Sequence, residues 1–216
     1  MSEITVDIWT DVVCPWCYIG KRRFESALQR FEYRDSVAVT WRSFELDPDG
    51  PRDGKLTIPQ CMQRDLGMSA EQAAAGMAMV TRLAAEVGLE YRLENAVPVN
   101  TFDVHRLIHF GEYRSLGEPV RERLLRGYTA EGAYLGDRRT LARLGSEAGL
   151  DTEEVEALLD GDRFGDAVRA DEQRAARLGV TGVPSFSFNG GRAVSGALSV
   201  ADILGRLRHA VLPAGA

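Results

Sequence analysis

The residues best suited to chemistry are two cysteines set close together near the start of the chain. Cys14 and Cys17 are separated only by Pro15 and Trp16. Residues 4–9 alternate apolar and polar side chains like a strand, and a helical pattern follows the second cysteine. Unpaired amides and the backbone dipole at a helix start stabilise a thiolate, which is the species that attacks a disulfide. We therefore expect Cys14 to be the nucleophile and Cys17 to resolve the mixed disulfide.

The two residues between the cysteines fit the same arrangement. Pro15 suits the first helical position, because it lacks the amide that would be unpaired there. Trp16 is expected to add apolar surface beside the sulfurs. Both residues are therefore predicted to contact a substrate.

Two other interpretations of the cysteine pair are weaker. An unreactive buried pair could lie anywhere, whereas this pair lies at a strand-to-helix junction. A structural zinc site needs four ligands, and only Cys61 and three histidines remain in the chain. The sequence thus predicts no metal and no bound cofactor. The active group is the redox-active disulfide itself, with glutathione or another thiol as co-substrate.

The elements around the cysteines predict a sheet assembled from both ends of the chain. A helix with an apolar stripe runs from the cysteines to about Tyr33, and residues 37–44 alternate like a second strand. Residues 185–188 form a third strand, a tight turn at 189–191 lets the following residues pair back, and a helix begins at Ser199. Neither end has enough strands to bury a core alone, so the two must join.

The segment between these ends is helical in pattern. Residues 47–53 form a proline- and aspartate-containing loop. Thr57 with Gln60, and Ser69 with Gln72, have the spacing of capping boxes. Further helical stripes follow, with another capping signal at Asp151 and Glu154 and a last long helix over about 162–178. We therefore predict one discontinuous domain from residues 1–46 and 180–216, and a helical insertion domain over residues 57–179.

A second motif, Thr181 to Pro184, places a proline at the start of the third strand. Together with the cysteine pair it resembles the thioredoxin superfamily, and the helical insertion resembles the DsbA family within it. Residues 11–24 are similar to the FrnE-like cytoplasmic branch, as are residues 44–46, 100–101, 105–107, 179–186 and 195–197. The expected fold class is α/β, a thioredoxin-like fold (βαβ … ββα) with a large all-helical insertion.

The resemblance also implies roles for particular residues. Cys14 would be the nucleophile, Cys17 the resolving thiol, and Val183–Pro184 a cis peptide bond facing them. The backbone of Val183 would then hydrogen-bond an extended substrate as an added strand does.

The roles of some residues stay open, and one residue differs from the type that is common in the family. His105 either follows a helix cap as a partly buried residue, or lies on a helix that covers the active site and lines the substrate groove. Leu198 stands where the family commonly has glutamine. Cys61 is a lone third cysteine, either a small apolar residue on a short helix or a thiol that exchanges with the main pair. Asp11 is expected to be a loop residue.

The bulk properties limit the partners and the compartment. The 216 residues carry a net charge of −6, which disfavours nucleic acid as a partner. No secretory signal or membrane-spanning stretch is visible, so we expect a cytoplasmic protein with no membrane partner. Its expected state is a monomer or a homodimer.

These features predict an enzyme, a DsbA-like protein-disulfide oxidoreductase or isomerase acting on protein or small-molecule thiol and disulfide substrates. A reducing cytosol favours reduction or isomerisation over oxidation. The alternative is a glutathione-dependent isomerase or transferase related to the 2-hydroxychromene-2-carboxylate isomerases, although these relatives usually have serine at the nucleophile position. A third hypothesis is a holdase whose apolar groove surrounds Trp16 and Pro184.

Overall fold

The structure, a computed structural model, describes residues 3–211. Contacts divide the chain into two compact units, unit 1 (residues 1–44 and 170–216) and unit 2 (residues 45–169). The boundary falls inside helix α8 (Gly165–Arg177), whereas the sequence places it after that helix, at residue 180. That the two parts are separate domains stays a prediction.

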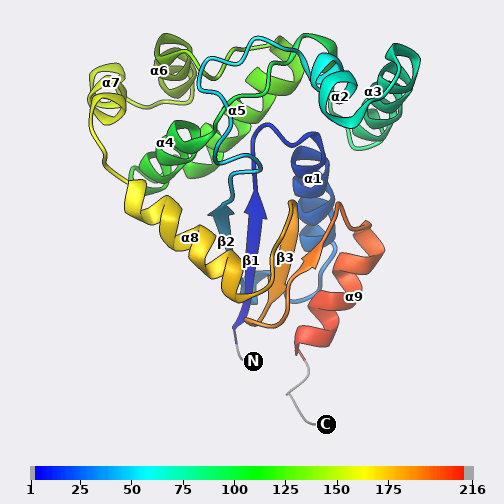
Figure 1. The fold of residues 1–216 in the computed structure, drawn as a ribbon. Coiled ribbons are helices and arrows are strands. Elements are labelled where there is room, and N and C mark those ends of the chain that lie inside the picture. The colour runs from blue at the N-terminus through cyan, green and yellow to red at the C-terminus, as the bar shows by residue number, and fades with distance from the viewer. Residues whose placement is uncertain (1–2, 212–216) are drawn as a thin grey trace. The chain divides into compact units, whose positions relative to one another are not determined.

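Unit 1 is built on a four-stranded sheet with the order β2-β1-β3-β4. The strands are β1 (Ile4–Thr10), β2 (Val37–Ser43), β3 (Ser185–Phe188) and β4 (Val194–Ser195). The central strand β1 pairs in parallel with β2 and antiparallel with β3. Strands from the two ends of the chain thus lie side by side (Figure 1). The expectation that the ends combine into one sheet is confirmed.

One face of this sheet is covered by α1 (Pro15–Gln29) and α9 (Val200–Val211) (Figure 1). Alternate residues of β1 point to this face, and the Phe24 ring stacks near the Phe186 ring with centroids 6.2 Å apart. The buried core here comprises Ile4, Val6, Ile8, Phe24, Ala27, Phe31, Phe186, Ile203 and Leu207. This is the α/β thioredoxin-like arrangement, βαβ followed by ββα, that the sequence predicts.

The opposite face of the sheet carries a buried ion-pair cluster. Asp7 on β1 accepts hydrogen bonds from Arg42, at 2.8 Å, and from Arg174 of α8, at 2.6 Å. Asp171 of α8 accepts from Arg42 at 3.0 Å and from the Ser43 amide at 3.0 Å. These bonds join α8 to β1 and β2, and the Trp9 side chain packs against Ala175 beside them. Residues 170–177 of α8 therefore belong to unit 1.

The end of the first helix differs from the expectation. Helix α1 stops at Gln29, not near Tyr33, because the Arg30 and Phe31 amides bond to carbonyls three residues back, at 3.1 Å each. A short 3₁₀ turn, η1 (Arg34–Ser36), follows. Phe31 still reaches the core and is only 2% exposed. The apolar stripe of α1 thus continues through Phe31, beyond the end of the helix.

The regular elements of unit 2 are all helices, and residues 45–169 contain no strand. Its buried core includes Leu107, Phe110, Leu124, Tyr128 and Leu144. Its elements before α8 are α2 (Ile58–Leu66), α3 (Ala70–Ala85), the 3₁₀ turn η2 (Leu93–Asn95), α4 (Phe102–Tyr113), α5 (Gly117–Glu131), α6 (Arg138–Glu147) and α7 (Thr152–Asp160).

Local capping signals begin these helices as predicted. Capping boxes form at Thr57 with Gln60 and at Ser69 with Gln72. The Asp151 side chain accepts from the amide of Glu154 at 3.0 Å. The buried Arg106 donates to the carbonyls at the end of α7 and just beyond it, which lack helical partners. Within residues 3–211 no helix combines the length and the apolar character needed to cross a bilayer.

Candidate active site

Cys14 is the residue immediately before the first turn of α1. It has extended backbone angles, φ −86° and ψ 111°, and Pro15 occupies the first helical position. The Cys14 amide donates to the Asp11 carbonyl at 3.2 Å, and the Cys17 amide donates to the Cys14 carbonyl at 3.0 Å. A tight turn therefore connects β1 to α1 and sets Cys14 at the positive end of the helix dipole.

Both cysteines of the pair are buried and reduced. Cys14 is 4% exposed and Cys17 is fully buried, and neither is in a disulfide. The Asp11 amide donates to the Cys17 sulfur at 3.4 Å. Asp11 is itself 1% exposed, so it is a buried part of the site and not only a loop residue.

The surroundings of Cys17 favour the protonated form of its thiol. Burial raises the pKa of the Cys17 thiol well above its usual range, and its hydrogen bond with the Cys14 sulfur raises that pKa further. The bond from the Asp11 amide opposes this effect in part. Because the thiolate is the reactive form, Cys17 is a poor first nucleophile.

A proline loop from the other end of the chain lies against Cys14. The peptide bond between Val183 and Pro184 is cis, as the resemblance implies. The Cys14 thiol donates to the Val183 carbonyl, with sulfur and oxygen 3.4 Å apart. Four of the predicted site residues, Cys14, Cys17, Val183 and Pro184, are thus brought together within unit 1.

The proline loop is anchored by two serines that the sequence does not single out. The hydroxyl of Ser185, a fully buried residue, donates to the Gly182 carbonyl at 2.6 Å and lies 2.7 Å from the Ser195 hydroxyl. The Gly196 amide donates to the Pro184 carbonyl at 2.8 Å. Both sides of the cis bond are therefore held by β3 and by the segment that follows β4.

Gly20 lets α1 approach the proline loop. A Cβ atom on Gly20 would lie 3.0 Å from Cγ of Pro184 and 3.3 Å from its Cβ, which is too close for unstrained packing. Gly20 lies one turn beyond Cys17 on the same helix. No sequence pattern pointed to this contact, because Gly20 and Pro184 lie 164 residues apart in the chain.

The remaining candidates near the cysteines lie where expected along the chain. Pro15 and Trp16 occupy the first turn of α1, and both are partly exposed. Leu198 packs against the core beneath α9, so the position that is commonly glutamine in the family is apolar here. Substrate contacts by Pro15 and Trp16 stay predictions.

His105 and Cys61 belong to unit 2. His105 lies on α4 and is 2% exposed, which makes it a buried residue and not a partly buried one. Thr101 precedes α4 and makes no capping bond with its side chain, whereas Asn100, one residue earlier, accepts from the Phe102 amide at 3.1 Å. Cys61 lies on α2, half-buried, and burial raises the pKa of its thiol. A groove-lining role for His105 and thiol exchange by Cys61 remain predictions.

The arrangement in unit 1 is suited to thiol chemistry. Within residues 3–211 no cluster of three or more histidine, cysteine, aspartate or glutamate side chains is placed to hold a metal ion. The site instead offers one sulfur at a helix start, a protonated sulfur beside it, and a backbone carbonyl facing the first.

Comparison with known proteins agrees with this geometry. The family model of the DSBA-like thioredoxin domain matches residues 5–208. A probable DsbA oxidoreductase from Streptomyces coelicolor is 42% identical, with a TM-score of 0.93 over 96% of this chain and 90% of that one. The uncharacterized protein YwbO of Bacillus subtilis is 25% identical over 85% of this chain and 86% of its own.

A more distant solved structure shares the fold. The cytosolic disulfide reductase DsbM from Pseudomonas aeruginosa, solved with glutathione, is 18% identical, with a TM-score of 0.58 over 95% of each chain. The match of the family model to most of the chain and the close likeness to the Streptomyces protein are decisive. The chain therefore belongs to the family of DsbA-like thioredoxin domains.

Proposed function

We propose that this protein catalyses thiol–disulfide exchange through Cys14 and Cys17, on protein or small-molecule disulfides. One observation carries the proposal: Cys14 lies at the start of α1, in contact with the carbonyl of Val183 and next to a buried, protonated Cys17. The family membership established above supports an oxidoreductase or isomerase of this kind.

The first step is attack by the Cys14 thiolate on a substrate disulfide. A bond forms between Cys14 and one substrate sulfur, and the other substrate sulfur leaves as a thiolate that takes up a proton. Cys17 does not compete at this stage, because its raised pKa keeps it protonated. The raised pKa of Cys17 thus sets the order of the two steps.

The second step releases the substrate. Cys17 loses its proton, its sulfur attacks the Cys14 sulfur, and the remaining substrate sulfur leaves as a thiol. The protein then holds a disulfide between Cys14 and Cys17, and the substrate has gained two electrons. Two molecules of glutathione would restore the dithiol and leave as one glutathione disulfide, a choice supported by the glutathione in the DsbM structure.

The loop around Val183 is suited to hold the peptide flanking the substrate disulfide. In the dithiol form the Val183 carbonyl accepts from the Cys14 thiol. Once Cys14 is bonded to a substrate sulfur it has no proton to donate, so this carbonyl becomes available to a substrate amide. Pairing of an extended peptide with an exposed backbone group is a common recognition mode.

The test compares three serine substitutions in an insulin-reduction assay and in refolding of a scrambled disulfide protein. Cys14→Ser should abolish both activities. Cys17→Ser should accumulate a mixed disulfide with the substrate, detectable by mass spectrometry. Cys61→Ser, the matched control in the same chain, should leave both rates unchanged.

Two outcomes would contradict the proposal. Activity that survives Cys14→Ser would show that the exchange does not run through this pair. Turnover of a glutathione-dependent isomerase substrate by Cys17→Ser, with no mixed disulfide, would favour the isomerase alternative instead.

A further inference from the structure

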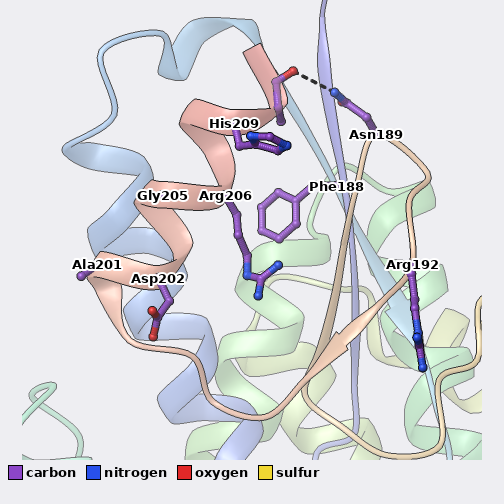
Figure 2. A pocket seen from close by; sticks show the side chains of 9 residues that line it. Phe188, Asn189, Arg192, Ala201, Asp202, Gly205, Arg206 and His209 are labelled. Atoms are coloured by element: carbon purple, nitrogen blue, oxygen red, sulfur yellow. Dashed lines mark hydrogen bonds between the residues drawn. The ribbon is translucent and has the colours of Figure 1, made fainter. Parts of the chain in front are cut away.

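A groove of about 630 Å³ lies on unit 1 between the end of β3 and one face of α9, and it contains neither cysteine. Phe188 and Asn189 line one side, and Asp202, Gly205, Arg206 and His209 of α9 line the other (Figure 2). Pockets of roughly 300–1,000 Å³ are the usual size for small-molecule sites. The groove is therefore large enough for a small organic ligand.

The walls of the groove are tied together by one side chain. Asn189, in the turn after β3, accepts from the Thr5 amide at 3.0 Å through Oδ1. Its Nδ2 donates to the Ala210 carbonyl near the end of α9 at 3.0 Å, the bond drawn in Figure 2. Ile203 and Leu207 hold the other face of α9 in the core, with 0% exposed surface each. The Asn189 bonds and the buried face of α9 thus fix the spacing between this helix and the turn after β3.

Gly205 opens the middle of the helical wall. Nothing lies within 4 Å of the position that a Cβ atom on Gly205 would occupy. Glycine inside a helix is less stable than alanine, and neither a cap nor a close packing contact requires it here. Because Gly205 has no side chain, α9 leaves room for a ligand at this position.

The groove contains two arginines, Arg192 and Arg206, whose guanidinium groups are available to a ligand. Among residues 3–211, Arg192, Arg206 and His209 make no hydrogen bond or ion pair with another side chain or with the backbone. By contrast Arg208, on the same helix but outside the groove, pairs with Glu32. The one carboxylate in the groove, Asp202, accepts from the Ser199 hydroxyl at 2.6 Å. The planar guanidinium group matches a carboxylate in shape and in hydrogen-bond donors.

From these observations we infer that the groove binds a small aromatic carboxylate. The ring of Phe188, a half-buried residue, provides a flat apolar surface for the aromatic body. Arg206 extends into the same space in Figure 2 and supplies the partner for the carboxylate, with Arg192 adding a second positive charge. The site is separate from the thiol chemistry, so binding there does not depend on the proposed function.

The experiment titrates the full-length, ¹⁵N-labelled protein with 2-naphthoate and follows amide shifts by NMR. We expect saturable shifts at Phe188, Gly205 and His209. The neutral 2-naphthamide and inorganic phosphate, which each lack one half of the ligand chemistry, should bind at least about tenfold more weakly. Equal binding of the amide, or no saturable shift at millimolar naphthoate, would overturn the inference.

Variants on α9 locate the site. Arg206→Gln should weaken naphthoate binding about tenfold, as loss of one charge-assisted contact does. Arg208→Gln is the matched control on the same helix and should bind as the parent does. Gly205→Leu should fill the groove and block binding while the helix stays intact. Insulin reduction should be the same in all three variants, so failure here and failure of the thiol mechanism are distinguishable. Equal effects of Arg206→Gln and Arg208→Gln would contradict the site.

Discussion

The hydroxyl groups of Ser185 and Ser195 lie 2.7 Å apart and join β3 to β4 at the residue that follows cis Pro184. Since the Ser185 hydroxyl also donates to the Gly182 carbonyl, one buried oxygen ties the proline loop to the edge of the sheet. The Val183 carbonyl that faces Cys14 lies inside this short closed loop. The position of that carbonyl is therefore set by a serine that makes no hydrogen bond to either sulfur.

Ser185→Ala should weaken the use of extended substrates. Without the hydroxyl, the Gly182 carbonyl loses its partner and the Val183 carbonyl loses its fixed position. We expect KM for a disulfide-containing peptide to rise about tenfold, because small misplacements at a reacting centre are costly. The rate with glutathione disulfide, which has no long peptide to pair with Val183, should change much less. Steady-state kinetics with both substrates checks this.

Ser187→Ala is the matched control for that experiment. Ser187 is equally buried, lies on the same strand, and donates to the Gly191 carbonyl at 2.7 Å, away from the cysteines. Each variant should lose about 1 kcal/mol of unfolding free energy. If both raise KM for the peptide equally, Ser185 has no special part in positioning the loop.

Gly20→Ala should disturb the contact between α1 and the proline loop. The added methyl would lie 3.0 Å from Pro184, so the helix or the loop must shift. Gly205→Ala, on α9, adds the same methyl to open space and is expected to stabilise the protein by about 0.5–1 kcal/mol. Relative to that variant, Gly20→Ala should be less stable by about 1–3 kcal/mol.

Denaturant unfolding of the two glycine variants measures this difference, and insulin reduction should fall only in Gly20→Ala. Equal unfolding free energies of Gly20→Ala and Gly205→Ala would show that Pro184 accommodates the added methyl group without loss of stability.

The reduced protein should lose stability in alkaline solution. Burial raises the pKa of Cys17 in the folded state above the value of 9.0 expected for an unburied thiol. Above that pH the unfolded chain releases the proton while the folded chain keeps it, so the unfolding free energy falls as pH rises. Below about pH 9 both states are protonated, and the contribution of Cys17 is constant.

Urea unfolding of the reduced protein between pH 7 and pH 10 tests this, with Cys17→Ala as the comparison. The variant should show a flatter decline over the alkaline range, since it lacks the buried thiol. Parallel curves would mean that other groups cause the decline.

Asp171→Ala should destabilise unit 1. The Asp171 side chain is 5% exposed and pairs with Arg42, whose own side chain is 28% exposed. Removing one partner of a buried pair leaves the other uncompensated, and we expect a loss of about 3 kcal/mol in unfolding free energy. Glu32→Ala removes an exposed ion pair with Arg208 and should change the unfolding midpoint little. Similar effects of the two substitutions in chemical denaturation would contradict this view of the cluster.

Much of the site could be predicted because its signals are local. The strand-like alternation of residues 4–9, the two cysteines and the proline after the first of them lie within fourteen residues. A turn from strand to helix places Cys14 at the helix start whatever the rest of the chain does. The capping boxes at Thr57 and Ser69 are local in the same way, since each needs only a partner three residues on.

What the sequence could not determine are the contacts between residues far apart in the chain. Gly20 touches Pro184, and Ser185 anchors the loop facing Cys14, but nothing in either residue type marks the pairing. The end of α1 at Gln29 was mispredicted for a related reason, because Phe31 continues the apolar pattern after the helix has stopped.

The sequence by itself determined the chemistry at the junction, namely which sulfur begins the helix and which one follows a turn later. Only the tertiary structure decided that Cys17 is fully buried, that a carbonyl faces Cys14, and that Asp7 and Asp171 share Arg42. The physical reason is the distance along the chain over which each interaction acts. Helix dipoles and caps act over a few residues, whereas burial and packing depend on strands and helices that meet only when the chain folds.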